Sequence, residues 1–184
     1  MEHIEYEERV LITESDYQKV IADIVKEGRP LRRFHIDNIY LDNEEKFIRT
    51  NKMMLRIRLI NDDFEELTLK IRNADNSNRE INETMESHPL IDKELDNKFD
   101  EYFKVAELVT ERIEVDYDEY LFVIDKNIYH GKIDYDLEIE AKSQQIAIIL
   151  IKVYCDKYNL QYDPNYKNKC QRAFEQADKE NGEN

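Results

Sequence analysis

Apolar and polar residues alternate along much of the chain, with the period of two that places successive side chains on opposite faces of a strand. The alternating segments predict strands at 4–12, 34–42, 53–60, 64–72, about 79–85, about 107–117, 119–126 and 131–142. Only the turn Asn61-Asp62-Asp63 separates the third strand from the fourth, which predicts a hairpin. Because most strands are neighbours in sequence, they favour an antiparallel sheet, and about eight of them are enough to close a barrel.

Helical periodicity interrupts the strands and dominates the C-terminal part of the chain. Four segments show it: one from the cap Thr13 to Gly28, one over 87–106 that Ser87 opens, one that Ser143 caps, and one over about 165–178. No internal repeat or domain boundary is visible. We therefore expect a single domain over 1–178 and a frayed polar tail over 179–184. The expected fold class is α+β, an eight-stranded antiparallel β-barrel with α-helices packed on the outside.

The polar faces of the predicted strands carry charge at nearly every position, whereas a strand that only faces water normally shows mixed polar residues. In 131–142, for example, Asp134, Asp136, Glu138 and Glu140 alternate with apolar residues. Two arrangements fit this pattern. Either apolar side chains fill a closed barrel and the charges face water, or apolar side chains pack outward against helices and the charges line a hydrated tunnel. The apolar helix faces need a surface to cover them, which favours the tunnel, but the pattern alone leaves both open.

Acidic and basic side chains occupy matching strand positions. Two carboxylate pairs stand two residues apart, Glu5 with Glu7 and Glu138 with Glu140. Side chains at such spacing on a strand point the same way and can share one hard cation through oxygen. The strands also carry Arg9, Arg56, Arg58, Lys70 and Arg112. Since the arginine fork bonds two phosphate oxygens and lysine acts as a point charge, the combination suits a complex of a metal with a polyphosphate.

Composition narrows the choice of ligand and location. The net charge of −15 argues against bulk binding of nucleic acid or acidic membranes, although it is compatible with a local positive site. No apolar run approaches the about 20 residues of a membrane helix, and the first residues lack the features of a secretory signal, so we expect a cytoplasmic protein. Cys155 and Cys170 have no metal-ligand spacing and are expected to be reduced packing residues. Without a P-loop or nucleophile elbow, a metal-activated water fits better than covalent catalysis.

The order of these motifs resembles the CYTH, or triphosphate tunnel metalloenzyme, family from about residue 4 to residue 173. The Glu-x-Glu-x-Lys strand of that family is similar to Glu5-Tyr6-Glu7-Glu8-Arg9, and its Arg-x-Arg and closing Glu-x-Glu strands are similar to Arg56-Ile57-Arg58 and Glu138-Ile139-Glu140. Further matches are Tyr40-Leu41-Asp42, Lys70, Glu80 (with Glu83 as the other choice), Arg112, Asp125, and the basic pair Lys169 and Arg172. Each motif is common by itself, but their shared order is not.

The resemblance implies a tunnel that binds Mg²⁺ or Mn²⁺ and a small-molecule triphosphate. It implies that the triphosphate is held by Arg56, Arg58, Lys70, Arg112, Lys169 and Arg172. The metal would be held by Glu5, Glu7, Glu80, Asp125, Glu138 and Glu140, and catalysis would depend on Glu5, Glu7 and Arg9. One departure is plain. Arg9 stands where the family usually has lysine, so a rigid fork replaces a flexible ammonium, and the rate or substrate choice can differ.

Three functions are compatible with such a site. The first is a metal-dependent triphosphatase acting on inorganic tripolyphosphate or on a nucleoside or thiamine triphosphate. The second is a class IV-type adenylate cyclase, which would need an adenine pocket for which the sequence carries no convincing marker. The third is a non-catalytic polyphosphate- or nucleotide-binding module, against which both acidic pairs argue, since anion binding alone does not require carboxylates. The sequence leaves open whether the chain forms a homodimer.

Overall fold

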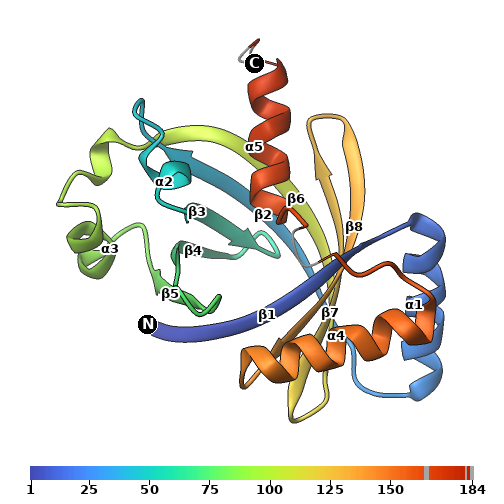
Figure 1. Ribbon diagram of the computed structural model, residues 1–184. Coiled ribbons are helices and arrows are strands. Elements are labelled where there is room, and N and C mark those ends of the chain that lie inside the picture. The colour runs from blue at the N-terminus through green and yellow to red at the C-terminus, as the bar shows by residue number, and fades with distance from the viewer. Residues whose placement is uncertain (164–165, 181, 183–184) are drawn as a thin grey trace.

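The computed structural model describes residues 1–163, 166–180 and 182. Within these residues, eight strands form one closed antiparallel barrel in the order β1-β5-β4-β3-β2-β6-β7-β8 (Figure 1). The strands are β1 (Glu2–Ile12), β2 (Arg32–Asp42), β3 (Met53–Ile60), β4 (Phe64–Arg72), β5 (Asn78–Glu83), β6 (Phe103–Asp116), β7 (Tyr120–Tyr129) and β8 (Lys132–Ala141). The helices are α1 (Glu14–Glu27), α2 (Phe47–Thr50), α3 (Pro89–Glu94), α4 (Gln144–Tyr158) and α5 (Lys169–Glu180). The predicted barrel is confirmed.

Strand β1 closes the barrel by changing partners halfway along its length. Residues from Glu2 to Glu5 pair with β5, whereas residues from Tyr6 to Ile12 pair with β8. Figure 1 shows β1 as one long strand that crosses the barrel. Its inward face therefore reaches from the β5 side of the interior to the β8 side.

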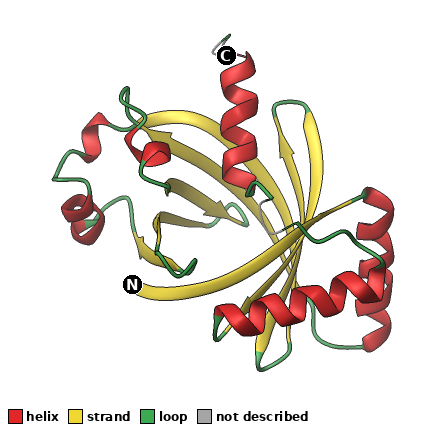
Figure 2. Ribbon diagram, in the orientation of Figure 1, coloured by secondary structure: helices red, strands yellow, loops and turns green. Residues whose placement is uncertain are grey.

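Apolar side chains pack outward against the helices in two clusters. Helices α1 and α4 cover a cluster that includes Phe122, Leu137 and Ile139. On the far side, α2 and α3 cover a cluster on β3 and β4 that includes Leu55 and Leu69 (Figure 2). Because the strands alternate, the charged side chains between these apolar ones face the interior. The tunnel arrangement is therefore confirmed, and the alternative with charges facing water is wrong.

Helix α5 packs against the interior rather than the outer wall. Its residues Cys170 and Phe174 form one cluster with Tyr40, Ala106 and Leu108. The last two lie on the same face of β6 as Arg112, which faces the interior. Helix α5 therefore covers one end of the barrel (Figure 1).

Helix termini follow the signals in the sequence at three positions. Thr13 and Asp16 form a complete capping box at the start of α1, and Gly28 ends that helix with φ of 71°. Ser143 caps α4 by accepting a hydrogen bond from the backbone of Ile146.

The helix predicted over 87–106 is wrong. Only α3 and a 3-10 turn at Phe99–Glu101 are helical there, and β6 begins at Phe103. Asp96 and Asn97 adopt left-handed conformations with φ of 53° and 58°, which ends the helix. Beyond the turn, β6 pairs with β2 from Phe103 onward. Pairing with a neighbouring strand therefore prevails over local helical periodicity.

The C-terminal helix also differs from its predicted bounds. Residues 166–168 are not helical, residue 165 lies outside the described residues, and α5 starts at Lys169. The helix continues through Lys179 and Glu180, which the sequence placed in the frayed tail; residues 181, 183 and 184 lie outside the described residues. Helix α2 was not predicted. No helix in the described part of the chain is long and apolar enough to cross a bilayer. Both cysteines are free and buried, as expected.

Truncation of Phe122 tests the cluster beneath α1 and α4. This side chain is fully buried and packs on Tyr154 with ring centroids 4.8 Å apart. We expect Phe122→Ala to lower the free energy of unfolding by about 3–5 kcal/mol, because it removes buried apolar surface and leaves a cavity. Urea denaturation measures the change. Phe64, which is 55% exposed, supplies the control, since Phe64→Ala should cost less than about 1 kcal/mol. Equal losses in the two variants would contradict the packing described here.

Candidate active site in the barrel interior

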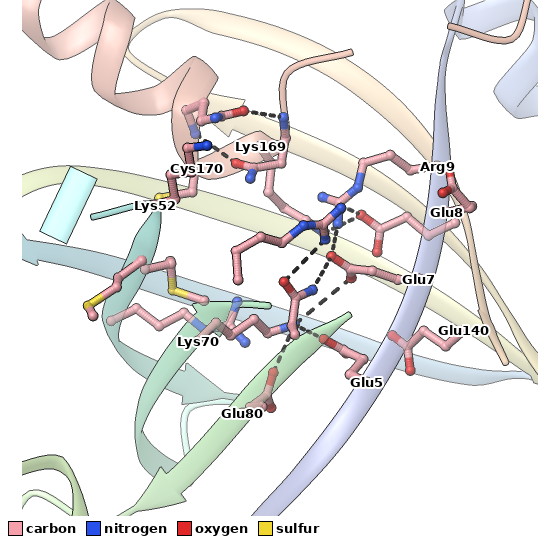
Figure 3. Close-up of a pocket in the computed structure, with 18 of the residues that line it drawn as sticks. Glu5, Glu7, Glu8, Arg9, Lys52, Lys70, Glu80, Glu140, Lys169 and Cys170 are labelled. Atoms are coloured by element: carbon pink, nitrogen blue, oxygen red, sulfur yellow. Dashed lines mark hydrogen bonds and ion pairs between the residues drawn. The ribbon is translucent and has the colours of Figure 1, made fainter. Parts of the chain in front are cut away.

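A charged cavity of about 780 Å³ occupies the barrel interior next to α5. Figure 3 shows side chains from several strands converging on it. Its wall includes Glu5, Glu7, Arg9, Arg56, Arg58, Lys70, Glu80, Arg112, Glu138, Glu140 and Lys169. Of the site residues predicted from the sequence, Asp125 and Arg172 do not line it. Motifs that are scattered along the chain therefore meet in a single cavity.

Strand register explains how the acidic pairs meet. Glu7 lies opposite Glu140, and Arg9 lies opposite Glu138, on the ladder between β1 and β8. On the other flank of the cavity, Lys70 of β4 lies opposite Glu80 of β5. Since cross-strand neighbours approach within about 5 Å at Cβ, each of these pairs interacts directly.

Carboxylates crowd the side of the cavity formed by β1 and β8. Burial, followed by the neighbouring charge of Glu5, raises the pKa of Glu140 to about 8. Burial also raises the pKa of Glu5, although Lys70 opposes it. Burial acts in the same direction on Glu7, but Arg9 and Lys70 outweigh it and lower the pKa of Glu7. Glu5 and Glu140 therefore hold protons more tightly than ordinary glutamates, as expected where negative charge is crowded.

The carboxylates suit a hard divalent cation by the type of their ligand atoms. All are oxygen donors, which Mg²⁺ and Mn²⁺ prefer, and the ion pair of Glu140 with Arg112 is a long contact of 3.9 Å. In the described part of the chain, no three acidic, histidine or cysteine side chains already stand together as a metal cluster. The contacts explain this, because Lys70 pairs with Glu5 while Arg9 pairs with Glu7 (Figure 3). A bound cation would take over charge compensation from these two bases.

Most basic side chains of the cavity are already paired with carboxylates. Arg112 donates to both oxygens of Asp125, at 2.9 and 2.8 Å, and lies 3.3 Å from Glu138. Lys169 contacts Asp125 and approaches Glu138 at 3.2 Å. Asp125 is fully buried behind these two bases. Asp125 therefore anchors Arg112 and Lys169, and its role as a metal ligand stays a prediction.

Arg56 differs from these paired bases. It is only 5% exposed, its Nε and one terminal nitrogen have no hydrogen-bond acceptor, and no ion pair involves it within the described ranges. The neighbouring Arg58 has an unpartnered Nε and a single contact of 3.7 Å with Glu66. Burying a cation without a full anionic partner is costly, so the buried Arg56 and the half-buried Arg58 on one strand indicate that an anion completes this side of the cavity.

Several further residues line the cavity without having been predicted, among them Asn78, Glu114, Lys52 and Tyr166. Asn78 donates to Glu7 at 3.1 Å, and Glu114 lies 3.7 Å from Arg112. Both could have been found from the alternation of side chains along a strand, because each stands two residues from a predicted site residue, Glu80 or Arg112, on the same face. Lys52 and Tyr166 also line the cavity. They lie outside the strands, in segments where periodicity carries no information.

The model of the CYTH domain family matches residues 3–168. The chain belongs to the CYTH domain family. This CYTH protein is similar to a proposed adenylate cyclase from Bacillus halodurans, with a TM-score of 0.78 and 20% identity over 94% of this chain and 98% of that chain. It is also similar to the proposed adenylyl cyclase HpAC1 from Hippeastrum, which has a dominant triphosphatase activity. That match has a TM-score of 0.68 and 18% identity over 95% of each chain.

A third solved structure extends the likeness to archaea. The PH1819 protein from Pyrococcus horikoshii aligns with a TM-score of 0.64 and 17% identity over 93% of this chain and 98% of that chain. At such identities the likeness establishes the fold of the CYTH protein and not its substrate. Comparison with curated proteins gives no match.

Proposed function

We propose that this CYTH protein is a metal-dependent triphosphatase that hydrolyses inorganic tripolyphosphate or a small organic triphosphate inside the barrel. The observation that carries the proposal is the buried Arg56 and the half-buried Arg58, which lack full anionic partners and face crowded carboxylates across one cavity. An anion alone would satisfy the arginines, and a cation alone would satisfy the carboxylates. A triphosphate that brings a divalent metal satisfies both.

The basic side chains would bind and orient the phosphate groups. Arg56 and Arg58 have N–H groups free for phosphate oxygens, and their forks can each bond two of them. Lys70, Arg112 and Lys169 line the same cavity and would stabilise the negative charge that develops on the leaving group. Arg9, between Glu7 and Glu138, would hold both carboxylates in place.

The acidic side chains would hold the metal and the attacking water. Glu7, Glu138 and Glu140 offer oxygen ligands on one wall, and Glu80 on the other. A bound Mg²⁺ or Mn²⁺ would neutralise phosphate oxygens and act as a Lewis acid. Glu5 would accept a hydrogen bond from the water and orient it toward the terminal phosphorus. In hydrolysis the water oxygen bonds to that phosphorus, the bridging P–O bond breaks, and orthophosphate and the shortened phosphate leave.

A cyclase is the second candidate, because part of the cavity wall is apolar. Met54 of β3 and Phe174 of α5 line the cavity together with the charged residues and belong to one packed cluster. They offer a surface for an organic group such as a nucleobase. In that reaction the ribose 3′-hydroxyl would attack the α-phosphate and pyrophosphate would leave.

Product analysis separates the candidates. Tripolyphosphate, ATP and thiamine triphosphate would each be incubated with the protein in Mg²⁺, Mn²⁺ or EDTA, and orthophosphate, pyrophosphate and cyclic AMP measured. Metal-dependent orthophosphate release supports the triphosphatase. Formation of cyclic AMP and pyrophosphate from ATP would instead support the cyclase. Saturable binding without any turnover would support only a binding module.

Binding of the metal is expected to release protons. Glu140, with a pKa near 8, is largely protonated at pH 7, whereas a metal ligand must be a carboxylate. We therefore expect binding of Mg²⁺ to release up to about one proton per ion at pH 7 and almost none above about pH 9. The affinity of the protein for Mg²⁺ should rise with pH between these two values. Calorimetry in HEPES and in Tris, which differ in ionisation enthalpy, measures the release. Glu140→Gln should abolish it, and equal heats in both buffers for the unmodified protein would contradict the assignment.

A further inference from the structure

Arg172 lies in a side-chain cluster next to the main cavity. Its Nε and one terminal nitrogen donate to the two carboxylate oxygens of Asp134, at 2.8 and 2.9 Å. The same terminal nitrogen donates to Asp136 at 2.6 Å, and Asp136 is fully buried in the barrel. Asn127 donates to both aspartates, at 3.1 and 2.8 Å. The cluster therefore fixes one guanidinium firmly on strand β8.

These contacts leave Arg172 poorly placed to bind a phosphate. Its remaining terminal nitrogen donates to the backbone carbonyl of Lys167 at 2.8 Å, so all three nitrogens already have protein acceptors. Two buried or half-buried carboxylates also surround it, which repel an approaching anion. Arg56, by contrast, has nitrogens without any acceptor.

The same contacts tie down the segment that leads into α5. Arg172 lies one helical turn after Lys169, so the two residues share one face of the first turns of α5. Its guanidinium also stacks on the ring of Tyr166, 4.9 Å from the centroid. Lys169 and Tyr166 both line the main cavity, where Lys169 approaches Glu138, and Lys169 also contacts Asp125 behind the cavity wall. Anchoring Arg172 to β8 therefore sets where these two side chains enter the cavity.

We propose that Arg172 is a positioning residue, which docks the start of α5 on Asp134 and Asp136 and thereby holds Lys169 in the triphosphate site without touching the triphosphate. This inference rests on the proposed function, because it assigns Lys169 to that site. It differs from the role that the resemblance implies for Arg172, which is direct contact with phosphate. The two roles predict different coupling between Arg172 and Lys169.

A double-mutant cycle distinguishes the two roles. Lys169→Ala, Arg172→Ala and the double variant would be compared for turnover and for binding of tripolyphosphate with Mg²⁺ by calorimetry. Since displacing a catalytic group by about 1 Å can cost about 100-fold, we expect Arg172→Ala to lose about 10- to 100-fold in kcat/KM. The loss in Arg172→Ala should divide between kcat and KM as it does in Lys169→Ala. The kcat/KM of the double variant should lie within about twofold of that of Lys169→Ala. If the two losses multiply, or if Arg172→Ala keeps full activity, the positioning role is wrong.

Controls separate positioning from unfolding and from failure of the proposed function. His130→Ala removes the 2.7 Å contact of His130 with Glu180 at the other end of α5 and should leave turnover unchanged. If Arg172→Ala does not fold, the same cycle is run in an Asp136→Asn background, in which the buried group left behind is neutral. If the unmodified protein neither binds nor hydrolyses any triphosphate, the proposed function fails. If the unmodified protein binds or hydrolyses a triphosphate but the losses of the two single variants multiply, only the proposed role of Arg172 is wrong.

Discussion

Replacing Arg56 with alanine is expected to lower kcat/KM for a triphosphate by about 100- to 1,000-fold, the usual cost of removing one donor that stabilises transition-state charge. Arg56 is buried, and two of its nitrogens lack acceptors. Within the described residues its side chain makes no ion pair, so truncation removes only its longer-range attraction to Glu66 and Glu80. For that reason the variant should unfold at the same denaturant concentration as the unmodified protein, or at a higher one.

Lost activity together with retained stability would distinguish an arginine that binds an anion from one that stabilises the fold. A structural arginine would show the opposite, because breaking a buried ion pair leaves an unpaired carboxylate and destabilises the fold. Steady-state kinetics and urea denaturation would be measured on the same preparation. Arg33→Ala, at an exposed position of β2 outside the cavity, is the matched control and should change neither quantity. A large loss of stability in Arg56→Ala, or unchanged kinetics, would contradict an anion site at Arg56.

The second large effect is expected at Glu138. This carboxylate lies 3.3 Å from Arg9, 3.3 Å from Arg112 and 3.2 Å from Lys169. Burial works against its charge, but Lys169, then Arg9 and Arg112, hold the pKa of Glu138 well below its usual range. We expect Glu138→Gln to reduce kcat by at least about 100-fold, since a ligand of the proposed metal and the anchor of three bases are lost together.

Binding should respond differently from turnover in this variant. With the charge of Glu138 removed, three bases are left with less compensation, so tripolyphosphate measured without metal should bind as tightly as before or more tightly. The variant should be less stable than the unmodified protein at neutral pH. This difference should shrink as the pH falls toward the lowered pKa of Glu138, because the unmodified protein then loses the same charge. Calorimetry and denaturation at pH 7 and at about pH 3 measure these effects. Glu65→Gln, at an exposed position of β4 outside the wall of the charged cavity, is the control. Loss of binding in step with kcat would contradict the assignment.

Strand residues of the site could be predicted because period two fixes which way a side chain points. Once Arg56 faces the interior, Arg58 must face it too, and the same holds for Glu138 and Glu140. What could not be predicted is how each base is paired. That depends on cross-strand register, such as Arg112 opposite Asp125, which brings together residues that no spacing along the chain connects.

Residues supplied by helices and loops were less predictable than those of strands. Arg172 shares one helix face with Lys169, and helical spacing alone gives no reason to separate their roles. Only the positions of Asp134 and Asp136 on β8 show that Arg172 is anchored outside the cavity. The helix wrongly predicted over 87–106 has a similar cause. The last residues of this segment belong to β6, whose partner strand β2 lies about 60 residues earlier, so the neighbouring sequence does not reveal the pairing.

The split pairing of β1 has a consequence for how the protein acquires its activity. The half of β1 from Tyr6 to Ile12 has β8 as its partner, so the first strand of the barrel cannot complete its pairing until the last strand of the barrel has been made. Such long-range pairing slows folding, because the chain must close its largest loop before the contact stabilises it. Glu7 and Arg9 meet Glu140 and Glu138 only in that final step. Refolding experiments should therefore find turnover returning together with barrel closure, and nascent chains that end before Lys132 should be wholly inactive rather than weakly active.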